Sequence, residues 1–425
     1  MSCKIYEIAE GVEFVSVNTN IFKTNELSVS LALPLKKETA SVNALMINLI
    51  SRKTANYPTI LSLNKKLANL YGAIVSSSVS KLGDCQILKI NMTGVDDRFS
   101  LDNQSIALEG VKLLCDMLFN PRLDDSGCFF AEDIDAEKRI LTEKIEAEEN
   151  EKRTYALKQA EKLMYADDVY AVDRYGTIDD IKNIQCSDVF TAWKNALSSS
   201  KVLVTAVGSA DMEAIKNLLS SAFAAVDRDY RNVIKTNIIT KCDDSIKEKI
   251  ERQDIKQGKL VLGLKTGLKP DDEFSPAMRA FCDIFGGGPY SKLFANVREK
   301  MSLCYYCSAR YVRAKGHIII QCGCNEDNMD KAVNEILNQL EIIKNGDFDE
   351  ELKSSKMALS DMYKSVNDTP DAIEAWYSSQ IIYDELKSPL QYADENNSVT
   401  KEQVQQCASL VKLDTIYKLA AKEAE

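Results

Sequence analysis

The chain has 425 residues, of which 45% are hydrophobic and 28% charged, a composition typical of a globular protein of two or three domains. Its net charge of −11, with no basic block to offset it, argues against nucleic-acid or anionic-membrane binding and leaves neutral or cationic peptides as suitable ligands. No apolar run approaches the roughly 18 residues of a membrane span. The start MSCKIYEIAEGVEF also lacks a signal-peptide core. We therefore expect a soluble cytoplasmic protein.

Twelve cysteines are scattered along the chain without the paired spacing of a disulfide framework, which favours reduced thiols and a cytoplasmic location. Two pairs lie close in sequence. Cys304 and Cys307 are expected to face opposite sides of a strand, because successive strand residues alternate. Cys322 and Cys324 are expected to share one face. Core packing is the expected role of both pairs.

The first half opens with an alternating strand pattern over residues 27–33, and a helix follows for which Ser41 is the expected N-cap. From Val42 onward the apolar residues of this helix recur at i, i+3, i+4, i+7 and i+8, which predicts one buried stripe. At 100° per residue, three positions fall on the opposite face: Ala44, Ile47 and Asn48.

A second helix, over residues 61–70, leads into a predicted hairpin of residues 74–79 and 85–92 that turns at Gly83. Apolar periodicity then predicts three further helical stretches, 106–119, 129–165 and 212–225, with a strand at 202–206 before the last. The charged residues of the long stretch are expected to form a solvated face.

The second half contains the most informative stretch, residues 286–324. Three glycines precede Pro289, whose fixed φ suits the first position of a helix. A hairpin of residues 305–311 and 317–324 follows, with its turn at Gly316. Arg298 lies near the end of the predicted helix and Tyr305 opens the strand, so that a cation and a phenol are expected beside one sheet edge.

The order of helix and hairpin thus occurs twice, which indicates an internal duplication. Three residue pairs are each separated by 233 positions: Tyr57 and Tyr290, Leu70 and Leu303, Gly83 and Gly316. The predicted fold class is α+β, with two tandem homologous domains that each consist of a mostly antiparallel sheet covered by helices. The predicted domains are 1–226 and 258–425, and the charge-rich linker 227–257 contains a strand-like stretch, 232–240.

Several stretches resemble the pitrilysin family of zinc peptidases, which includes insulinase and the mitochondrial processing peptidase. They are KTANYPT and LYGA in the first half, AVGSAD at the end of a strand, and GGGPYSKLF with VREKMSLCYY in the second half. The resemblance covers nearly the whole chain. It implies two homologous α+β domains and a chamber for peptides.

The family's zinc motif, His-x-x-Glu-His, supplies two imidazole ligands one helical turn apart and a catalytic Glu. The resemblance places this motif on residues 44–48, where no ligand or base is present. His317 is the only histidine in the chain, so a two-histidine zinc site cannot be assembled. Glu143 lies about where the family's third ligand would be, with Glu146 as the alternative. No metal or other cofactor is expected in this chain.

Family members that cleave peptides use an Arg and a Tyr seven residues apart, in a stretch resembling REKxxLxY, to bind substrate beside the zinc. Arg298 and Tyr305 match that spacing. Both side chains can donate hydrogen bonds to a peptide carbonyl that gains negative charge during attack. The alternative interpretation is a surface cation and a half-buried strand aromatic.

The resemblance therefore implies a non-catalytic, substrate-binding subunit of a heterodimeric zinc peptidase. In this hypothesis a partner subunit holds the zinc, a peptide is the substrate, and Arg298 and Tyr305 complete the partner's site. The alternative hypothesis is a scaffold or peptide-binding protein of the same fold with no role in proteolysis.

Overall fold

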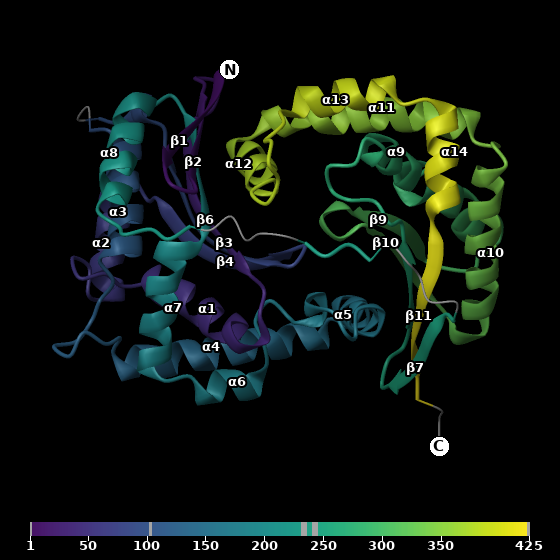
Figure 1. The fold of residues 1–425 in the computed structure, drawn as a ribbon, viewed down its shortest axis with the longest axis horizontal. Helices are drawn as coiled ribbons and strands as arrows, with labels where there is room; N and C mark the ends of the chain where they lie inside the picture. Colours follow the sequence, from purple (N-terminus) through teal and green to yellow (C-terminus); the bar gives the residue numbers. More distant parts are fainter. Residues whose placement is uncertain (1, 102–103, 231–235, 240–244, 423–425) are drawn as a thin grey trace. The chain divides into compact units, whose positions relative to one another are not determined.

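A computed structural model of the chain describes residues 2–101, 104–230, 236–239 and 245–422 (Figure 1). The chain forms two compact units, and each unit draws on three segments of the sequence. The first unit consists of residues 1–145, 172–235 and 366–386, and the second of residues 146–171, 236–365 and 387–425.

The first unit contains a six-stranded sheet with the order β1-β2-β6-β3-β5-β4. Strands β2 and β6 run parallel, and every other neighbouring pair in this sheet is antiparallel. The hairpin of β4 and β5 turns at Gly83, whose φ of 55° favours glycine. The strands are β1 (Ser2–Ala9), β2 (Val12–Asn18), β3 (Thr24–Pro34), β4 (Ile74–Leu82), β5 (Cys85–Val95) and β6 (Lys201–Gly208).

Alternate residues of each strand face opposite sides of this sheet, and both sides are covered. On one side, Val29 and Leu31 belong to a large apolar core to which seven helices contribute. Those helices are α1 (Lys37–Ile50), α2 (Ile60–Asn69), α3 (Ile106–Phe119), α4 (Ala131–Asn150), α6 (Ile178–Asn183), α7 (Cys186–Ser199) and α8 (Met212–Ala224). A short 3₁₀ turn, η1 (Asp97–Phe99), precedes α3.

The other side of this sheet is covered by α12 (Pro370–Ser378), which comes from the second half of the sequence and follows the 3₁₀ turn η5 (Val366–Asp368). Its apolar residues pack against Val15 and Val207. The buried carboxylate of Glu374 accepts a hydrogen bond from Ser28 Oγ at 2.6 Å. A helix from the opposite half thus completes the first unit.

The second unit contains a five-stranded sheet with the order β7-β11-β8-β10-β9. Only β7 and β11 run parallel. Its hairpin of β9 and β10 turns through the 3₁₀ segment η4 (Arg313–Lys315) at Gly316, where φ is 65°. The strands are β7 (Lys247–Gln253), β8 (Gly258–Lys265), β9 (Tyr306–Val312), β10 (His317–Cys324) and β11 (Lys412–Ala421).

The helices of the second unit come mostly from the second half of the chain. The exception is α5 (Lys152–Met164), which the 3₁₀ turn η2 (Val169–Ala171) follows. Ala156 and Ala160 of α5 pack with Val261 and Tyr417 of the sheet. The others are α9 (Ser275–Gly286), η3 (Leu293–Lys300), α10 (Glu326–Lys344), α11 (Asp349–Ser365), α13 (Pro389–Ser398) and α14 (Lys401–Leu410). In the described part of the chain, no helix has the length and apolar character needed to cross a membrane.

The two sheets repeat one topology, because the order β2-β6-β3-β5-β4 corresponds strand for strand to β7-β11-β8-β10-β9. The predicted duplication and the α+β fold class are confirmed. The predicted division at residues 227–257 follows the duplication. The compact units differ from it, because α5 of the first copy belongs to the second unit and α12 of the second copy belongs to the first unit. Each unit is therefore completed by one helix of the other copy.

Most predicted elements are present, and two details of the prediction were wrong. Helix α1 begins at Lys37, with Lys36 at its N-cap position, so Ser41 lies inside the helix and is buried. Glu38 in the first turn favours this earlier start, since acidic residues stabilise helix N-termini. The predicted linker contains strand β7. Most of the strand-like stretch 232–240 lies outside the described residues, and its described part, 236–239, is not a strand.

The expectation that all cysteines are reduced was also wrong. Cys128 and Cys186 form a disulfide with a Cα–Cα distance of 6.0 Å. It links the segment before α4 to the first residue of α7. The sequence gave no indication of it because 57 residues separate the two cysteines and neither belongs to a recognisable motif.

Candidate functional site

The three positions that resemble the zinc motif lie on the second half of α1. Ala44 and Ile47 are each 0% exposed and belong to the apolar core of the first unit. Asn48 is half-buried, and its Oδ1 accepts a hydrogen bond from Ser77 Oγ of β4 at 2.9 Å. Two of the three side chains therefore act as core residues and the third links the helix to the sheet.

The expectation that these residues occupy a face free of packing was wrong. Helix α1 contacts β4 and β5 and also α6 and α7. Because neighbours cover more than one side of it, an apolar side chain opposite the main stripe is buried as well. A helical wheel identifies the main stripe and cannot show a second layer of neighbours.

Glu143, the expected remnant of the third ligand, is an exposed residue of α4. Its carboxylate lies 3.8 Å from Arg139 Nε one turn earlier, and both side chains are largely exposed. The buried carboxylate of α4 is that of Glu137, whose Oε1 lies 3.0 Å from Arg52 Nε just beyond the end of α1. Burial raises the pKa of Glu137, and Arg52 opposes that shift. Charge periodicity alone could not distinguish Glu137 from its solvated neighbours.

The zinc that the family resemblance implies does not fit these residues. Zinc ligands in proteins are Cys, His, Asp or Glu side chains, and α1 offers none of them at positions 44–48. Over residues 2–101, 104–230, 236–239 and 245–422, no group of three or more such side chains is arranged to hold a metal ion.

In the second unit, the glycines before Pro289 end a helix rather than start one. Helix α9 runs to Gly286, where an added Cβ would lie 2.5 Å from the backbone N of Ala309, so only glycine allows this approach to β9. The next turn is fixed by Tyr290, whose hydroxyl donates to Asp283 Oδ2 at 2.5 Å. The predicted helix start at Pro289 was therefore wrong by four residues.

The helix that follows, η3, is a π-helix over Leu293–Lys300. Met301 N–H donates to the carbonyl of Asn296, five residues earlier, at 3.0 Å. Asn296 Nδ2 donates to Gln339 Oε1 of α10 at 3.0 Å, which attaches η3 to the unit. Short π-helical segments occur frequently at functional sites.

Arg298 lies on this π-helix and leaves part of its side chain exposed. Its guanidinium lies 4.5 Å from the ring centre of Phe294 and 3.6 Å from the Glu299 carboxylate. About 40% of the Arg298 side chain is exposed. Such contacts orient the guanidinium without covering its donors.

Tyr305 lies just before β9 and is 64% exposed. Its N–H donates to the Gly323 carbonyl of β10 at 2.8 Å, which fixes the backbone at the sheet edge. Leu303 N–H donates to the Val297 carbonyl at 3.1 Å, which ties the segment before Tyr305 to the helical residue next to Arg298. The exposed ring makes Tyr305 a surface aromatic rather than a half-buried one.

The chain between η3 and β9 brings cysteines together in a way that the sequence did not predict. Ser302 has a φ of 50°, so the backbone is not extended before β9. Tyr305 N–H bonds to the Gly323 carbonyl, so Cys304 lies beside the hairpin that carries Cys307 and Cys322. The expectation that Cys304 and Cys307 face opposite sides of a strand was wrong, because β9 begins only at Tyr306.

His317, the only histidine, begins β10 and is buried. Its Nδ1 lies 2.9 Å from the hydroxyl of Tyr165, within the second unit. His317 is therefore a packed residue at the start of its strand.

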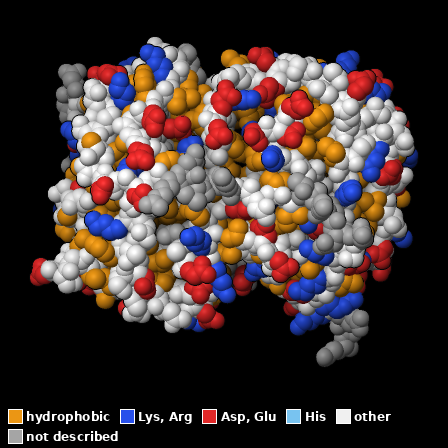
Figure 2. All heavy atoms as spheres, viewed as in Figure 1, with side chains coloured by type: hydrophobic (Ala, Val, Ile, Leu, Met, Phe, Trp, Pro, Cys, Tyr) orange, Lys and Arg blue, Asp and Glu red, His pale blue; other side chains and the backbone are white. Residues whose placement is uncertain are grey.

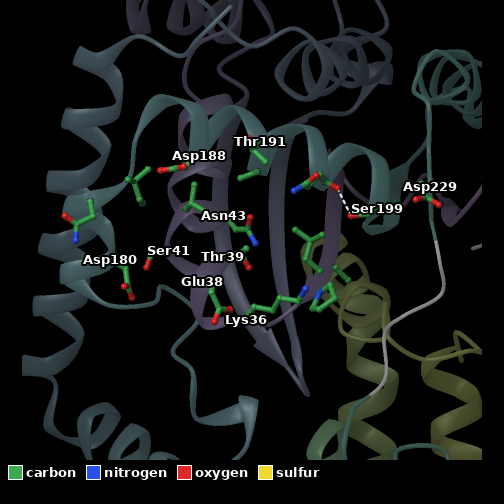
Figure 3. A pocket seen from close by; sticks show the side chains of 18 of the residues that line it. Lys36, Glu38, Thr39, Ser41, Asn43, Asp180, Asp188, Thr191, Ser199 and Asp229 are labelled. Carbon is green, nitrogen blue, oxygen red and sulfur yellow. Dashed lines mark hydrogen bonds between the residues drawn. The ribbon is translucent and has the colours of Figure 1, made fainter.

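The first unit also contains a cavity of about 790 Å³ beside the start of α1. Figure 3 shows Asp188 and Thr191 of α7 on one side and Lys36 and Glu38 on the other. Asp180 also lines the cavity, so that carboxylates outnumber cations there and favour positively charged groups. These residues come from separate segments and share no motif, which is why the sequence did not indicate the cavity. Figure 2 shows acidic and basic side chains interspersed over the visible surface.

Residues 183–359 match the family model described as the Peptidase M16 inactive domain. Over 415 residues the chain is 29% identical to the Probable inactive metalloprotease YmfF of Bacillus subtilis, and the match covers 96% of this chain and 95% of that relative. The chain is thus similar to M16 peptidases in sequence. The predicted resemblance to the family of pitrilysin and insulinase is confirmed, and the matching descriptions are those of inactive-type M16 proteins.

Solved structures show the same fold. A conserved protein from Enterococcus faecalis has a TM-score of 0.88 and 26% identity, covering 100% of this chain and 99% of that one. A protein from Pseudomonas fluorescens described as a peptidase M16 inactive domain has a TM-score of 0.79 and 16% identity, with full coverage of both chains. A protease from Helicobacter pylori has a TM-score of 0.81 and 15% identity, covering 99% of each chain. The last two show similarity of fold alone.

Proposed function

We propose that this M16 homologue is the non-catalytic, substrate-binding subunit of a heterodimeric zinc peptidase. In this proposal Arg298 and Tyr305 act at the zinc site of a partner subunit. One observation carries the proposal. Two of the three positions that the resemblance assigns to the zinc motif, Ala44 and Ile47, are buried core residues. In contrast, the side chains of Arg298 and Tyr305 are partly or largely exposed at one end of the η3 segment.

The two side chains suit the binding of a peptide carbonyl. Arg298 offers guanidinium donors in a rigid plane, and Tyr305 offers a phenolic hydroxyl. Donors aimed at an oxygen that gains negative charge stabilise the transition state more than the ground state. A pair of this kind therefore contributes to turnover and not only to affinity.

The first test examines the isolated chain. We expect no stoichiometric zinc after dialysis and no hydrolysis of peptides, since α1 offers no ligand or base. Metal analysis and a peptide-cleavage assay on the same sample make the measurement. One tightly held zinc per chain, together with chelator-sensitive cleavage by the pure protein, would contradict the proposal.

The second test uses the chain reconstituted with an M16 subunit from the same cell that carries His-x-x-Glu-His. We expect Tyr305→Phe to lower turnover by roughly 100- to 1000-fold, the usual effect of removing one oxyanion donor. Arg298→Ala is expected to impair both substrate binding and turnover. Gel filtration checks that the complex is intact.

Matched controls come from the same segment. Lys300→Ala removes an exposed cation from the same helix, and Tyr306→Phe removes a hydroxyl from the neighbouring residue. Both are expected to leave turnover within a few-fold of the wild type. If Tyr305→Phe and Arg298→Ala also leave turnover unchanged in an intact complex, the scaffold or peptide-binding alternative replaces the proposal.

A further inference from the structure

The cavity beside the start of α1 has a buried floor and an exposed rim. Its volume of about 790 Å³ is in the range typical of sites for small molecules. Ser41 and Asn43 of α1 belong to the floor and are 3% and 4% exposed. Thr191 and Asn195 of α7 are exposed residues of the rim. All the residues that line the cavity belong to the first unit.

Helix α7 presents one polar stripe to this cavity (Figure 3). Its members recur every three or four residues and are Asp188, Thr191, Asn195 and Ser199. From the first to the last of them the helix advances 11 residues (199 − 188 = 11). Because an α-helix rises 1.5 Å per residue, the stripe is about 16 Å long. The lining is therefore long enough for an elongated ligand.

The hydroxyl groups of the stripe are available to a ligand only as acceptors. Thr191 Oγ1 donates to the Ser187 carbonyl at 2.8 Å. Ser199 Oγ donates to the Asn195 carbonyl at 2.7 Å, the bond drawn as a dashed line in Figure 3. A hydroxyl has one hydrogen to donate, so each of these groups has only lone pairs left for the cavity.

Asn43 adds a further acceptor to the floor. Gln86 Nε2 donates to the carbonyls of Ala40 and Arg174 at 2.8 and 2.6 Å, so the other end of that amide, Oε1, is an acceptor. Asn43 Nδ2 donates to this oxygen at 3.0 Å. The network fixes the orientation of both amides. It leaves Asn43 Oδ1, which accepts no hydrogen bond from the described residues, as an acceptor for the cavity.

Two carboxylates of the lining carry charges that no neighbouring cation balances. Asp180 Oδ2 accepts from Thr177 Oγ1 at 2.6 Å, and Asp188 Oδ2 accepts from the Gln185 N–H at 2.8 Å. These neutral donors orient the carboxylates. Within the part of the chain that the structure describes, no Lys or Arg forms an ion pair with either of them. Lys36 is the only cation among the described lining residues.

A buried hydroxyl of the floor has no partner. Among the described residues, Ser41 Oγ forms no hydrogen bond, although a serine inside a helix commonly bonds to the carbonyl four residues earlier. A Cβ added at Gly176 would lie 1.9 Å from Ser41 Oγ, so glycine leaves room for this hydroxyl. A buried polar group without a partner is unfavourable. A ligand with a hydrogen-bonding group over the floor would satisfy it.

We propose that this cavity binds a linear aliphatic polyamine. Its ammonium groups donate to the carboxylates of Asp180 and Asp188 and to the Ser41 hydroxyl, and its methylene groups contact apolar lining residues such as Val42 and Ala192. A polyamine at neutral pH offers donors and positive charge, which match a lining of acceptors and negative charge. The proposal does not rest on the proposed role in peptide cleavage.

Two other cationic ligands match the cavity less well. A peptide brings a carbonyl with every residue, and each carbonyl that enters the cavity needs a donor. The donors of the lining are few, because Thr191 and Ser199 have already given their hydrogens to the helix. A metal ion needs several ligands around one point, and no group of three or more acidic, His or Cys side chains in the described ranges is arranged to hold one.

The decisive experiment is calorimetric titration of the full-length chain with spermidine, a linear triamine, in about 0.15 M NaCl, which screens weak attraction to the acidic surface. We expect saturable binding of one spermidine per chain. Asp180→Asn and Asp188→Asn each remove a charge and keep an acceptor, and each should weaken binding by at least roughly threefold.

The matched control is Asp179→Asn. It removes the same charge from the neighbouring residue of α6, whose side chain is 90% exposed and does not line the cavity. We expect this variant to bind spermidine as the wild type does. The absence of saturable binding to the wild type, or an equal weakening by Asp179→Asn and Asp180→Asn, would overturn the proposal.

Two further measurements test the floor and the class of ligand. Ser41→Ala removes a hydroxyl without a partner, so the melting temperature should not fall while spermidine binding weakens. Unchanged binding would overturn the proposal, because the ligand would then not reach the floor. Mg²⁺ and the diamine putrescine carry the same charge, and we expect only putrescine to compete with spermidine. Equal competition by Mg²⁺, or binding of a lysine-rich peptide in place of spermidine, would also overturn it.

Discussion

In the first copy of the duplicated module, helix α2 begins at Ile60 as a regular α-helix, and Thr59 and Ser62 form a capping box before it. In the second copy, the segment at the same place begins at Leu293, 233 residues later, and is a π-helix. Lys292 precedes it without a side-chain cap. The same position in the fold thus supports a well-capped helix in one copy and a less regular one in the other.

The residues that carry chemistry also differ between the copies. With the offset of 233, Arg298 corresponds to Lys65 and Tyr305 to Gly72 (298 − 233 = 65 and 305 − 233 = 72). Cys304 corresponds to Tyr71 in the same way. The guanidinium, the phenol and the thiol at these positions therefore belong to the second copy alone, although both copies carry a cation at the first of them. In the second copy they lie on or just after the π-helix.

The helices that precede these segments are alike. Ala44 and Ile47 of α1 correspond to Ala277 and Ala280 of α9, and all four residues are at most 2% exposed. In both copies this helix supplies core residues at the corresponding positions. In the first copy, these are the positions where the family resemblance places the zinc motif. The comparison teaches that this helix has the same structural role in both copies, which is to supply buried core residues.

The largest expected effect comes from restoring a polar residue on that helix. Ile47→Glu removes a packed side chain and buries a carboxylate in the core, so we expect the free energy of unfolding of the first unit to fall by roughly 3 to 5 kcal/mol. Ala280→Glu tests the same position in the second copy and should be comparably severe. Thermal unfolding of each variant makes the measurement.

Ile47→Val serves as the control, since it keeps an apolar side chain and should cost about 1 kcal/mol. The triple change Ala44→His, Ile47→Glu and Asn48→His, which the sequence pattern alone would allow, is expected to unfold the first unit rather than create a metal site. A folded Ile47→Glu variant with wild-type stability would show that this side of α1 is open and that the comparison with α9 fails.

Much of the fold could be predicted because it depends on patterns that the sequence displays directly. Alternation identified the buried strand β3, and the glycines at Gly83 and Gly316 marked both hairpin turns with φ values of 55° and 65°. The constant offset of 233 predicted the duplication. The burial of Ala44 and Ile47 was missed because α1 has neighbours on more than one side, β4, β5, α6 and α7, which lie further along the chain.

The position of Cys304 could not be predicted for a related reason. The chain is not extended before β9, where Ser302 has a positive φ, and non-glycine residues with a positive φ have no reliable sequence signal. A strand drawn from Cys304 onward places Cys304 and Cys307 on opposite faces, whereas β9 begins only at Tyr306, so the alternation does not apply to Cys304. The spacing of Arg298 and Tyr305 came from the family resemblance, and their role stays a prediction.

A second, smaller effect concerns the ion pair between Arg52 and Glu137 in the first copy. Arg52 corresponds to Phe285, which is 0% exposed in the second copy, whereas Arg52 pairs with the buried carboxylate of Glu137 at 3.0 Å. Arg52→Ala leaves that carboxylate without its cation. Because the Arg52 side chain is 44% exposed and solvent weakens the pair, we expect a loss of about 1 to 2 kcal/mol at pH 7.

The loss should depend on pH with a definite sign. Burial raises the pKa of Glu137 in the folded state, so the folded chain binds the proton more tightly and its stability falls as the pH rises from the unfolded value of about 4.3 through the folded value. Removing Arg52 raises the folded pKa further, and the variant should lose more at pH 7 than at pH 4. Urea unfolding at both pH values makes the measurement, and Arg52→Ala/Glu137→Gln should abolish the difference. An equal loss at the two pH values would show that Arg52 acts through packing alone.

The smallest expected loss of stability tests whether capping explains why α2 and η3 differ at their first turn. Thr59 accepts a hydrogen bond from Ser62 N–H at 3.0 Å, and the Thr59 N–H donates to Ser62 Oγ at 3.1 Å. Thr59→Ala removes the side-chain half of this box and should cost about 1 kcal/mol. Thr59→Ser keeps the hydroxyl and should cost much less. Lys292→Ala, at the uncapped position of the second copy, loses no cap, and its cost comes from the burial of Lys292 and its pair with Glu351 at 2.9 Å. Because both side chains of this pair are largely buried, salt should weaken it little. If Thr59→Ser destabilises as much as Thr59→Ala, the methyl group rather than the cap stabilises α2, and capping does not explain why the first copy is α-helical where the second is not.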